Sequence, residues 1–139
     1  MTSPPPPPPS ASAPPQVLIV CTDLIFSTKI TGTAKALKQT YGVARTSERL
    51  GELLDGSAGN AVVPTLIIDL NSAGIDPIAM IFEAKAHAAR PRVVAFLSHV
   101  DVELAEAARM AGADRVMARS GFVNELPAII ASASGNSGI

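Results

Sequence analysis

Short apolar runs alternate along this chain with longer segments of helical periodicity, and this alternation restricts the fold more than any other feature. The first run covers residues 17–21 (VLIVC), and two others cover residues 64–69 (PTLIID) and 93–98 (VVAFLS). Each run is too short for a buried helix, so each predicts a strand that is buried on both faces. Strands that alternate with helices are joined by right-handed crossovers, which predicts one parallel sheet between two layers of helices.

The remaining pattern completes five strands and five helices. Two further strands are predicted over residues 43–45 and 115–118, and helices over residues 30–41, 47–54 and 122–130. Asp76 and Asp101 are predicted N-caps of two more helices. The expected inward-facing residues of the four longer helices are Ile30, Ala34, Leu37 and Tyr41; Ile78, Ile81, Phe82 and Ala89; Leu104, Ala105, Ala108 and Ala111; and Phe122, Leu126, Ile129 and Ile130. The predicted fold is a flavodoxin-like (βα)5 three-layer sandwich with a five-stranded parallel sheet in the order 2-1-3-4-5.

Two segments of biased composition flank this pattern. Residues 1–16 contain six consecutive prolines at positions 4–9, which favour an extended polyproline helix, so we expect a disordered tail. This tail acts either as a spacer or as the ligand of a proline-binding domain. Residues 132–139 are rich in Ser and Gly and predict a flexible C-terminal tail. One domain over residues 17–131 remains between them.

Charge and cysteine content exclude several classes of function. Eleven Lys and Arg residues against twelve Asp and Glu give a net charge of -1, which disfavours binding to nucleic acid or to an anionic membrane. The single cysteine excludes an internal disulfide and a multi-cysteine zinc site. No run approaches the roughly 18 apolar residues of a membrane helix. We therefore expect a soluble, cytoplasmic protein.

Polar residues follow the predicted strands, at the edge of the sheet where open parallel sheets bind ligands. They are Thr22, Asp23, Asp69, Ser98 and Arg119. An acid, a hydroxyl and a cation at one edge suit phosphorylation of Asp69, because the new phosphoryl oxygens need these groups and a Mg²⁺ ion around them. The same residues also suit turn caps and a simple ion pair between Arg119 and Asp69.

Residues 107–114 (AARMAGAD) resemble the alanine-rich helix and following turn of the receiver domain in bacterial two-component response regulators. The resemblance extends over about residues 17–130. Asp69 matches the position of the phosphoacceptor in this family, and Ser98 and Arg119 match its switch positions. The resemblance therefore implies a receiver fold that acts in signal transduction.

The chain departs from this family at the positions that bind Mg²⁺ and phosphate. The paired acids after the first strand are replaced by Cys21 and Thr22, so Asp23 is the only nearby candidate metal ligand. A switch aromatic, a lysine and a proline are replaced by Val116, Arg119 and Ser120. We therefore expect a pseudoreceiver, which has the receiver fold without standard phosphorylation and without a bound cofactor. An ordinary receiver that is phosphorylated on Asp69 is the alternative.

A cofactor-binding protein of the same architecture is a third hypothesis. Residues 27–33 (STKITGT) loosely resemble the phosphate loop of flavodoxins. Four residues separate this segment from the first strand, however, and the chain has no Trp and one Tyr to stack on a flavin. We expect this segment to lie within a helix. No catalytic triad or nucleotide loop is present in the sequence, so we do not expect an enzyme.

The resemblance also implies that the module works through protein partners. Receiver domains commonly bind partners through the face formed by their fourth helix, fifth strand and fifth helix. The corresponding candidates here are Arg109, Met110, Val116 and Phe122. The expected partner is a histidine kinase or another signalling protein, and a homodimer is a further hypothesis.

Overall fold

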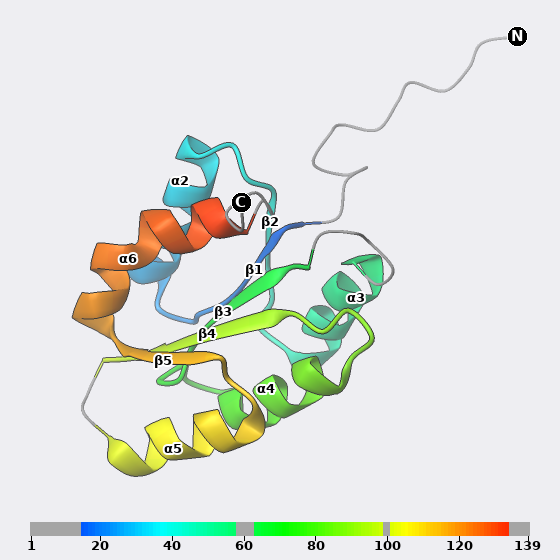
Figure 1. Cartoon of the computed structure of the whole chain (residues 1–139), viewed down its shortest axis with the longest axis vertical. Helices are drawn as coiled ribbons and strands as arrows, with labels where there is room; N and C mark the ends of the chain where they lie inside the picture. The colour runs from blue at the N-terminus through cyan, green and yellow to red at the C-terminus, as the bar shows by residue number, and fades with distance from the viewer. Residues whose placement is uncertain (1–14, 58–62, 99–100, 134–139) are drawn as a thin grey trace, which may run out of the picture.

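The computed structural model describes residues 15–57, 63–98 and 101–133, which form a sheet of five parallel strands between helices (Figure 1). The strands are β1 (Val17–Val20), β2 (Tyr41–Val43), β3 (Thr65–Asp69), β4 (Arg92–Leu97) and β5 (Arg115–Ala118). They lie in the order β2-β1-β3-β4-β5, so the predicted fold class is confirmed. Val17 is in register with Tyr41 and with Thr65, and this parallel pairing places the carboxyl ends of the strands at one edge.

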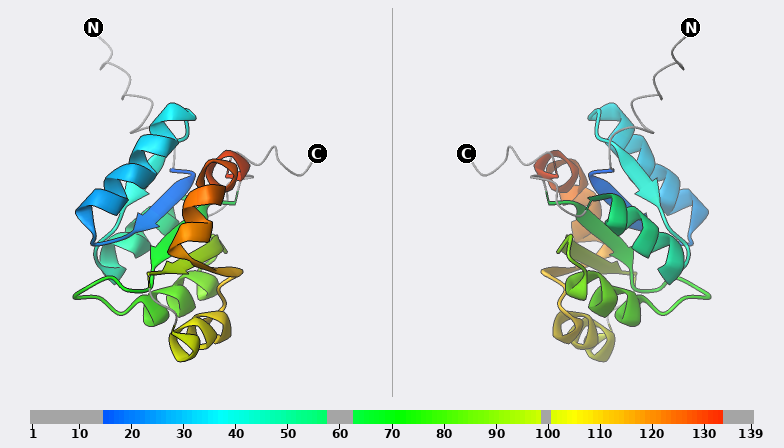
Figure 2. Two further views of the ribbon diagram at one scale, coloured as in Figure 1. Left: turned by 90° about the vertical axis from the view of Figure 1, so that its left-hand side faces the viewer. Right: turned by 90° about the vertical axis from the view of Figure 1, so that its right-hand side faces the viewer.

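The helices of the described residues cover both faces of the sheet. They are α2 (Leu24–Ala36), α3 (Ser47–Ser57), α4 (Pro77–Ala86), α5 (Val102–Ala111) and α6 (Arg119–Ser132). Helices α2 and α6 lie on one face, and α3, α4 and α5 lie on the other (Figures 1 and 2). None of them is both long enough and apolar enough to span a membrane.

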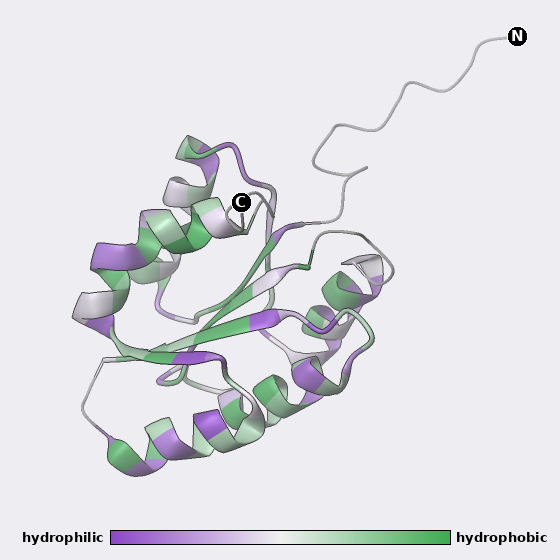
Figure 3. Cartoon of the chain, viewed as in Figure 1, coloured by the Kyte–Doolittle hydropathy of each residue, from purple (hydrophilic) through white to green (hydrophobic). Residues whose placement is uncertain are grey.

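Burial on both faces explains why the central strands are continuous apolar runs. In β1, Leu18 and Val20 pack into the core beneath α3, α4 and α5, whereas Val17 and Ile19 pack into the core beneath α2 and α6. All four side chains are completely buried. The hydropathy colouring accordingly shows β1, β3 and β4 as mostly apolar (Figure 3).

The predicted helix boundaries are confirmed where capping residues define them. The Asp76 side chain accepts a hydrogen bond from the Ala79 N–H at 3.1 Å, and the Asp101 side chain accepts one from the Leu104 N–H at 3.0 Å. Helix α5 ends at Gly112, whose φ of 117° lies in the left-handed region. A Cβ atom at Gly112 would lie 2.7 Å from Lys85 Cγ, so both the backbone and the packing require glycine here.

The first helix differs from the prediction at both ends. It begins at Leu24 because Asp23 caps it by accepting a hydrogen bond from the Phe26 N–H at 3.0 Å. It ends at Ala36, and Lys38 then turns the chain with a φ of 58°. Tyr41 therefore belongs to β2 rather than to the helix, and β2 covers Tyr41–Val43 instead of the predicted residues 43–45. Residues 27–33 lie inside α2, as expected, and this segment forms no phosphate loop.

The apolar face of α4 also differs from the prediction. Its buried residues are Pro77, Met80, Ile81 and Ala84, which follow the spacing of a helix that packs on a sheet. Phe82 was expected in the core, but 66% of its surface is exposed. Residues 1–14 and 134–139 of the predicted tails lie outside the described residues, and Ser132 belongs to α6.

Candidate functional site

The residues predicted to converge at the carboxyl edge of the sheet do line one pocket. Its volume is about 410 Å³. Its lining residues are Thr22, Asp23, Asp69, Asn71, Ala73, Ser98 and Arg119. Asp69 is the last residue of β3, Arg119 is the first residue of α6 directly after β5, and the others follow β1, β3 and β4. The parallel register of the strands therefore assembles this site from segments that are far apart in the sequence.

Asp69 lies at the base of the pocket, and both of its carboxylate oxygens are engaged. Oδ1 accepts a hydrogen bond from the Asn71 N–H at 2.8 Å. Oδ2 lies 3.5 Å from an Arg119 guanidinium nitrogen and accepts a 3.6 Å hydrogen bond from the Cys21 thiol. Only 2% of the Asp69 surface is exposed. The carboxylate is thus buried and compensated by groups of the protein itself.

Arg119 places a positive charge between two carboxylates. Its guanidinium nitrogens lie 3.5 Å from Asp69 Oδ2 and 3.7 Å from Asp23 Oδ2, which are ion-pair rather than hydrogen-bond distances. The guanidinium carbon lies 4.3 Å above the centre of the Phe26 ring. The Arg119 Nε atom is buried and has no hydrogen-bond partner among the described residues. Attraction to two acids and one aromatic face therefore holds this side chain in place.

A cluster of three aromatic rings lies beneath Arg119. The Phe26 ring centre lies 5.0 Å from that of Phe96 and 5.9 Å from that of Phe122, and the Phe96 and Phe122 rings stack at 4.4 Å. Phe122 is completely buried in this cluster. The prediction that Phe122 belongs to an interaction surface is therefore wrong, because its ring completes the core beneath the pocket.

The hydroxyl groups of the pocket bind neighbouring loops. The Ser98 hydroxyl and the Ser98 N–H both donate to Asn71 Oδ1, at 3.0 and 2.6 Å. The Thr22 hydroxyl accepts a hydrogen bond from the Ala73 N–H at 2.9 Å. Asn71 thus connects the loop after β3 to the end of β4. The sequence analysis missed this role, although an asparagine two residues after a strand-end acid is a signal for such a turn.

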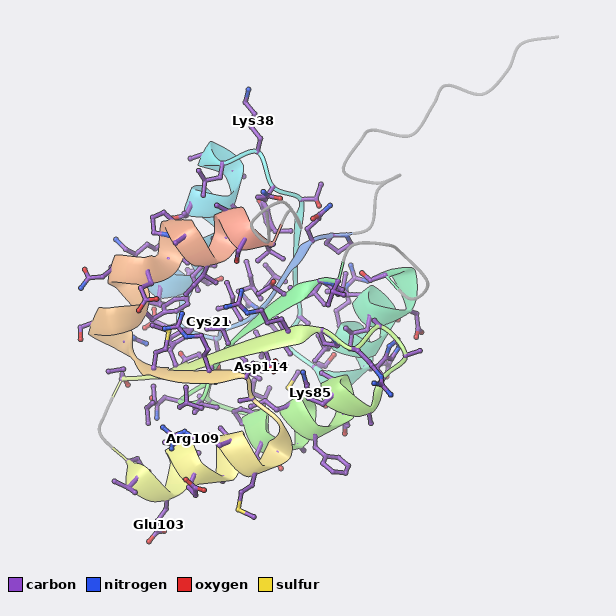
Figure 4. The ribbon with its side chains drawn as sticks, in the orientation of Figure 1. Cys21, Lys38, Lys85, Glu103, Arg109 and Asp114 are labelled. Atoms are coloured by element: carbon purple, nitrogen blue, oxygen red, sulfur yellow. The ribbon has the colours of Figure 1, made fainter. Side chains whose placement is uncertain are left out.

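Cys21 is a core residue beside the pocket (Figure 4). Burial, together with the nearby Asp69 carboxylate, raises the pKa of the Cys21 thiol to about 11, although a hydrogen bond to the Asp23 carbonyl acts in the opposite direction. The group is therefore a neutral thiol that donates to Asp69 rather than a nucleophile.

The donor set of the pocket does not fit a divalent metal ion. Mg²⁺ takes oxygen ligands and is usually bound through one or two carboxylates, together with water and substrate phosphate. Here Asp23 and Asp69 share the Arg119 guanidinium, and Asp23 Oδ1 is committed to capping α2. Among the described residues, no three His, Cys, Asp or Glu side chains are grouped so that they could hold a metal.

The other three residues of the predicted interaction face line two different hollows. Arg109 and Val116 line a hollow of about 380 Å³ between α5 and β5. Met110 is 81% exposed, and it lines a different groove, between α4 and α5. Successive residues of a helix point about 100° apart, which separates Met110 from Arg109.

Solved structures with the same arrangement are receiver domains of response regulators. The receiver domain of NtrX from Brucella abortus matches with a TM-score of 0.68 and 19% identity, over 87% of this chain and 99% of that one. A receiver domain from Rhodospirillum rubrum matches with a TM-score of 0.68 and 16% identity, over 86% of this chain and 93% of that one. The chain has the receiver fold.

A third similar structure is a response regulator from Burkholderia pseudomallei that contains a phosphorylated aspartic acid, a calcium ion and citrate. It matches with a TM-score of 0.67 and 16% identity, over 86% of this chain and 68% of that one. No family model matches the sequence, and a search of curated proteins finds no match. The similarity to receiver domains is therefore a similarity of fold. The sequence identity is too low to transfer the roles of site residues from those structures to this chain.

Proposed function

We propose that this chain is a pseudoreceiver, a receiver-like signalling module that acts by binding protein partners and is not phosphorylated in the standard way. The observation that carries the proposal is the Arg119 guanidinium between Asp23 and Asp69. Arg119 stands where the family has a lysine, and here its one guanidinium pairs with both carboxylates that a metal ion would need. The module is not an enzyme under this proposal.

A metal ion that entered the pocket would compete with Arg119 for the Asp23 and Asp69 carboxylates. Opposite unit charges about 4 Å apart near a protein surface attract each other by about 4 kcal/mol before the loss of hydration is counted. Arg119 has two such partners and the Phe26 ring, whereas Thr22 offers an entering ion only a neutral hydroxyl. Transfer of a phosphoryl group to Asp69 would in addition require the release of the Asn71 N–H or the Cys21 thiol.

The residues at the switch positions favour a single constitutive conformation. The Ser98 hydroxyl is already bound to Asn71, and Val116, at the position of the family's switch aromatic, has no ring that could relocate. The hollow lined by Arg109 and Val116 is the surface at which we place the partner, a histidine kinase or another signalling protein. The lining of this hollow combines apolar and charged side chains, so an anchor side chain of the partner can be buried in it.

The alternative function is a receiver that is phosphorylated on Asp69. The observation that favours it is the convergence of Asp69, Ser98 and Arg119 in one pocket. Intact mass after incubation with Mg²⁺ and acetyl phosphate distinguishes the two. We expect no added phosphoryl group on the wild-type chain, because Arg119 already pairs with Asp23 and Asp69 and Thr22 offers Mg²⁺ only a neutral hydroxyl.

A double variant provides the positive control for this expected negative result. Thr22→Asp combined with Arg119→Lys returns an acid and a compact ammonium to the pocket. We expect this double variant to gain one phosphoryl group, and the triple variant with Asp69→Ala to lose it again. A wild-type chain that gains the group, and no longer does so as Asp69→Ala, contradicts the pseudoreceiver proposal and supports the alternative.

A further inference from the structure

The groove between α4 and α5 exposes two large apolar side chains that the proposed function does not use. Phe82 is 66% exposed and Met110 is 81% exposed, and both line this groove, which has a volume of about 610 Å³. Its other lining residues are Asp76, Ile78, Ala79, Glu83, Ala107 and Ala111. Exposed aromatic and methionine side chains that line one groove suit the binding of an apolar partner surface.

The shape of the groove suits a helix. Helices α4 and α5 lie next to each other on the same face of the sheet (Figures 1 and 2). Three of the lining residues, Ala79, Ala107 and Ala111, have the smallest side chains that a helix surface offers short of glycine. A third helix can therefore approach the pair closely and pack its ridge into the groove, with Phe82 and Met110 against its apolar face.

The charges around the groove are negative. Asp76 and Glu83 line it, and its lining contains no Lys or Arg. Glu103 lies one turn before Ala107 on α5 and points away from the body of the protein (Figure 4). The neighbouring cations are already neutralised, because Lys85 pairs with Asp114 at 2.9 Å and Arg109 pairs with Glu106 at 3.4 Å.

We propose that this groove binds a basic amphipathic helix of a partner protein. The apolar face of that helix would cover Phe82 and Met110, and its Lys or Arg residues would face Asp76, Glu83 and Glu103. A second copy of this chain is a poorer occupant, because it would bring the same acids against one another. The groove is a different surface from the hollow at Arg109 and Val116, so the proposal is independent of that one.

The test uses the full chain and two synthetic helical peptides of Leu with Lys and of Leu with Glu, each labelled for fluorescence anisotropy. We expect the Leu/Lys peptide to bind and the Leu/Glu peptide not to bind. Phe82→Ser and Met110→Ser should each weaken peptide binding tenfold or more. Glu83→Lys should also weaken binding, and its effect should be larger at low salt than at high salt. The matched control is Ile25→Ser, which removes an 86% exposed apolar side chain from α2 on the other face and should change the affinity less than twofold.

Amide NMR shifts in α4 and α5 on addition of the peptide locate the binding site. Melting curves of every variant confirm that each one is folded. Equal binding of both peptides, or binding that Phe82→Ser and Met110→Ser leave unchanged in folded protein, overturns the proposal. Sedimentation that finds a dimer which Phe82→Ser dissociates also overturns it, because a second copy would then occupy the groove.

Discussion

The Asp114 carboxylate connects three elements on the α4/α5 side of the sheet, and its removal should destabilise the fold measurably. Asp114 Oδ2 accepts hydrogen bonds from the Val93 N–H of β4 at 2.7 Å and from Lys85 Nζ of α4 at 2.9 Å (Figure 4). Lys85 Nζ also donates to the Pro91 carbonyl at 3.0 Å. The turn before β5 is thereby joined to the start of β4 and to the last turn of α4.

The expected loss of unfolding free energy follows from the contacts of Asp114 with Val93 and Lys85. A hydrogen bond to a charged group contributes about 1.5–3 kcal/mol, and a partly exposed ion pair contributes about 0.2–1 kcal/mol. The Asp114 side chain is 43% exposed, which favours the lower end of each range. We expect Asp114→Ala to lower the free energy of unfolding by about 2 kcal/mol. Asp114→Asn keeps an acceptor for Val93 and should cost about 1 kcal/mol, and Lys85→Met about 0.5 kcal/mol.

The stabilisation should also depend on pH. Burial acts to raise the pKa of the Asp114 carboxyl, but the Val93 N–H and the Lys85 ammonium together hold it below its ordinary value of 3.8. A carboxyl with a lowered pKa in the folded state stabilises the protein fully above its unfolded pKa. The difference in stability between wild type and Asp114→Asn should therefore be constant above about pH 5 and shrink as the pH falls below 3.8.

Urea denaturation of the wild type, the single variants and the Lys85→Met/Asp114→Ala double variant measures these quantities. A cost below about 0.5 kcal/mol for Asp114→Ala would refute the reasoning about the Val93 hydrogen bond. A difference between wild type and Asp114→Asn that persists unchanged to pH 2 would refute the assignment of the pH dependence to this carboxyl.

Three further predictions concern other parts of the molecule. Gly112→Ala should destabilise the protein by more than about 1 kcal/mol in urea denaturation, because the φ of Gly112 is 117° and an added Cβ would lie 2.7 Å from Lys85 Cγ. The control is Gly51→Ala in α3, whose added Cβ meets no atom within 4 Å. Millimolar Mg²⁺ should leave the wild-type melting temperature unchanged, since a ligand of the folded state would raise it; a saturable rise would show a working metal site. The Cys21 thiol, with a pKa of about 11, should react with a disulfide reagent at pH 8 only as fast as the protein unfolds, and rapid labelling of the folded protein would contradict its burial.

The central strands and the helix ends with capping residues could be predicted from the sequence because their causes are local. Burial on both faces makes β3 and β4 continuous apolar runs, and the caps at Asp76, Asp101 and Gly112 act within one turn of the chain. The parallel sheet and its strand order follow from that alternation together with the resemblance to receiver domains. The convergence of Asp69, Ser98 and Arg119 could be predicted as well, because each follows a strand of one parallel sheet.

Contacts between residues far apart in the chain were decided only by the tertiary structure. The sequence placed Phe82 and Phe122 on apolar helix faces alike, yet α4 turns Phe82 outward and α6 buries Phe122 beneath Arg119. It placed Arg109 and Met110 on one predicted surface, and the packing of α5 between α4 and β5 separates them. Periodicity states which residues share a face, but not which neighbour that face meets. The position of the Arg119 charge between Asp23 and Asp69, on which the proposed function depends, is set by the way β1, β3 and β5 bring their carboxyl ends together.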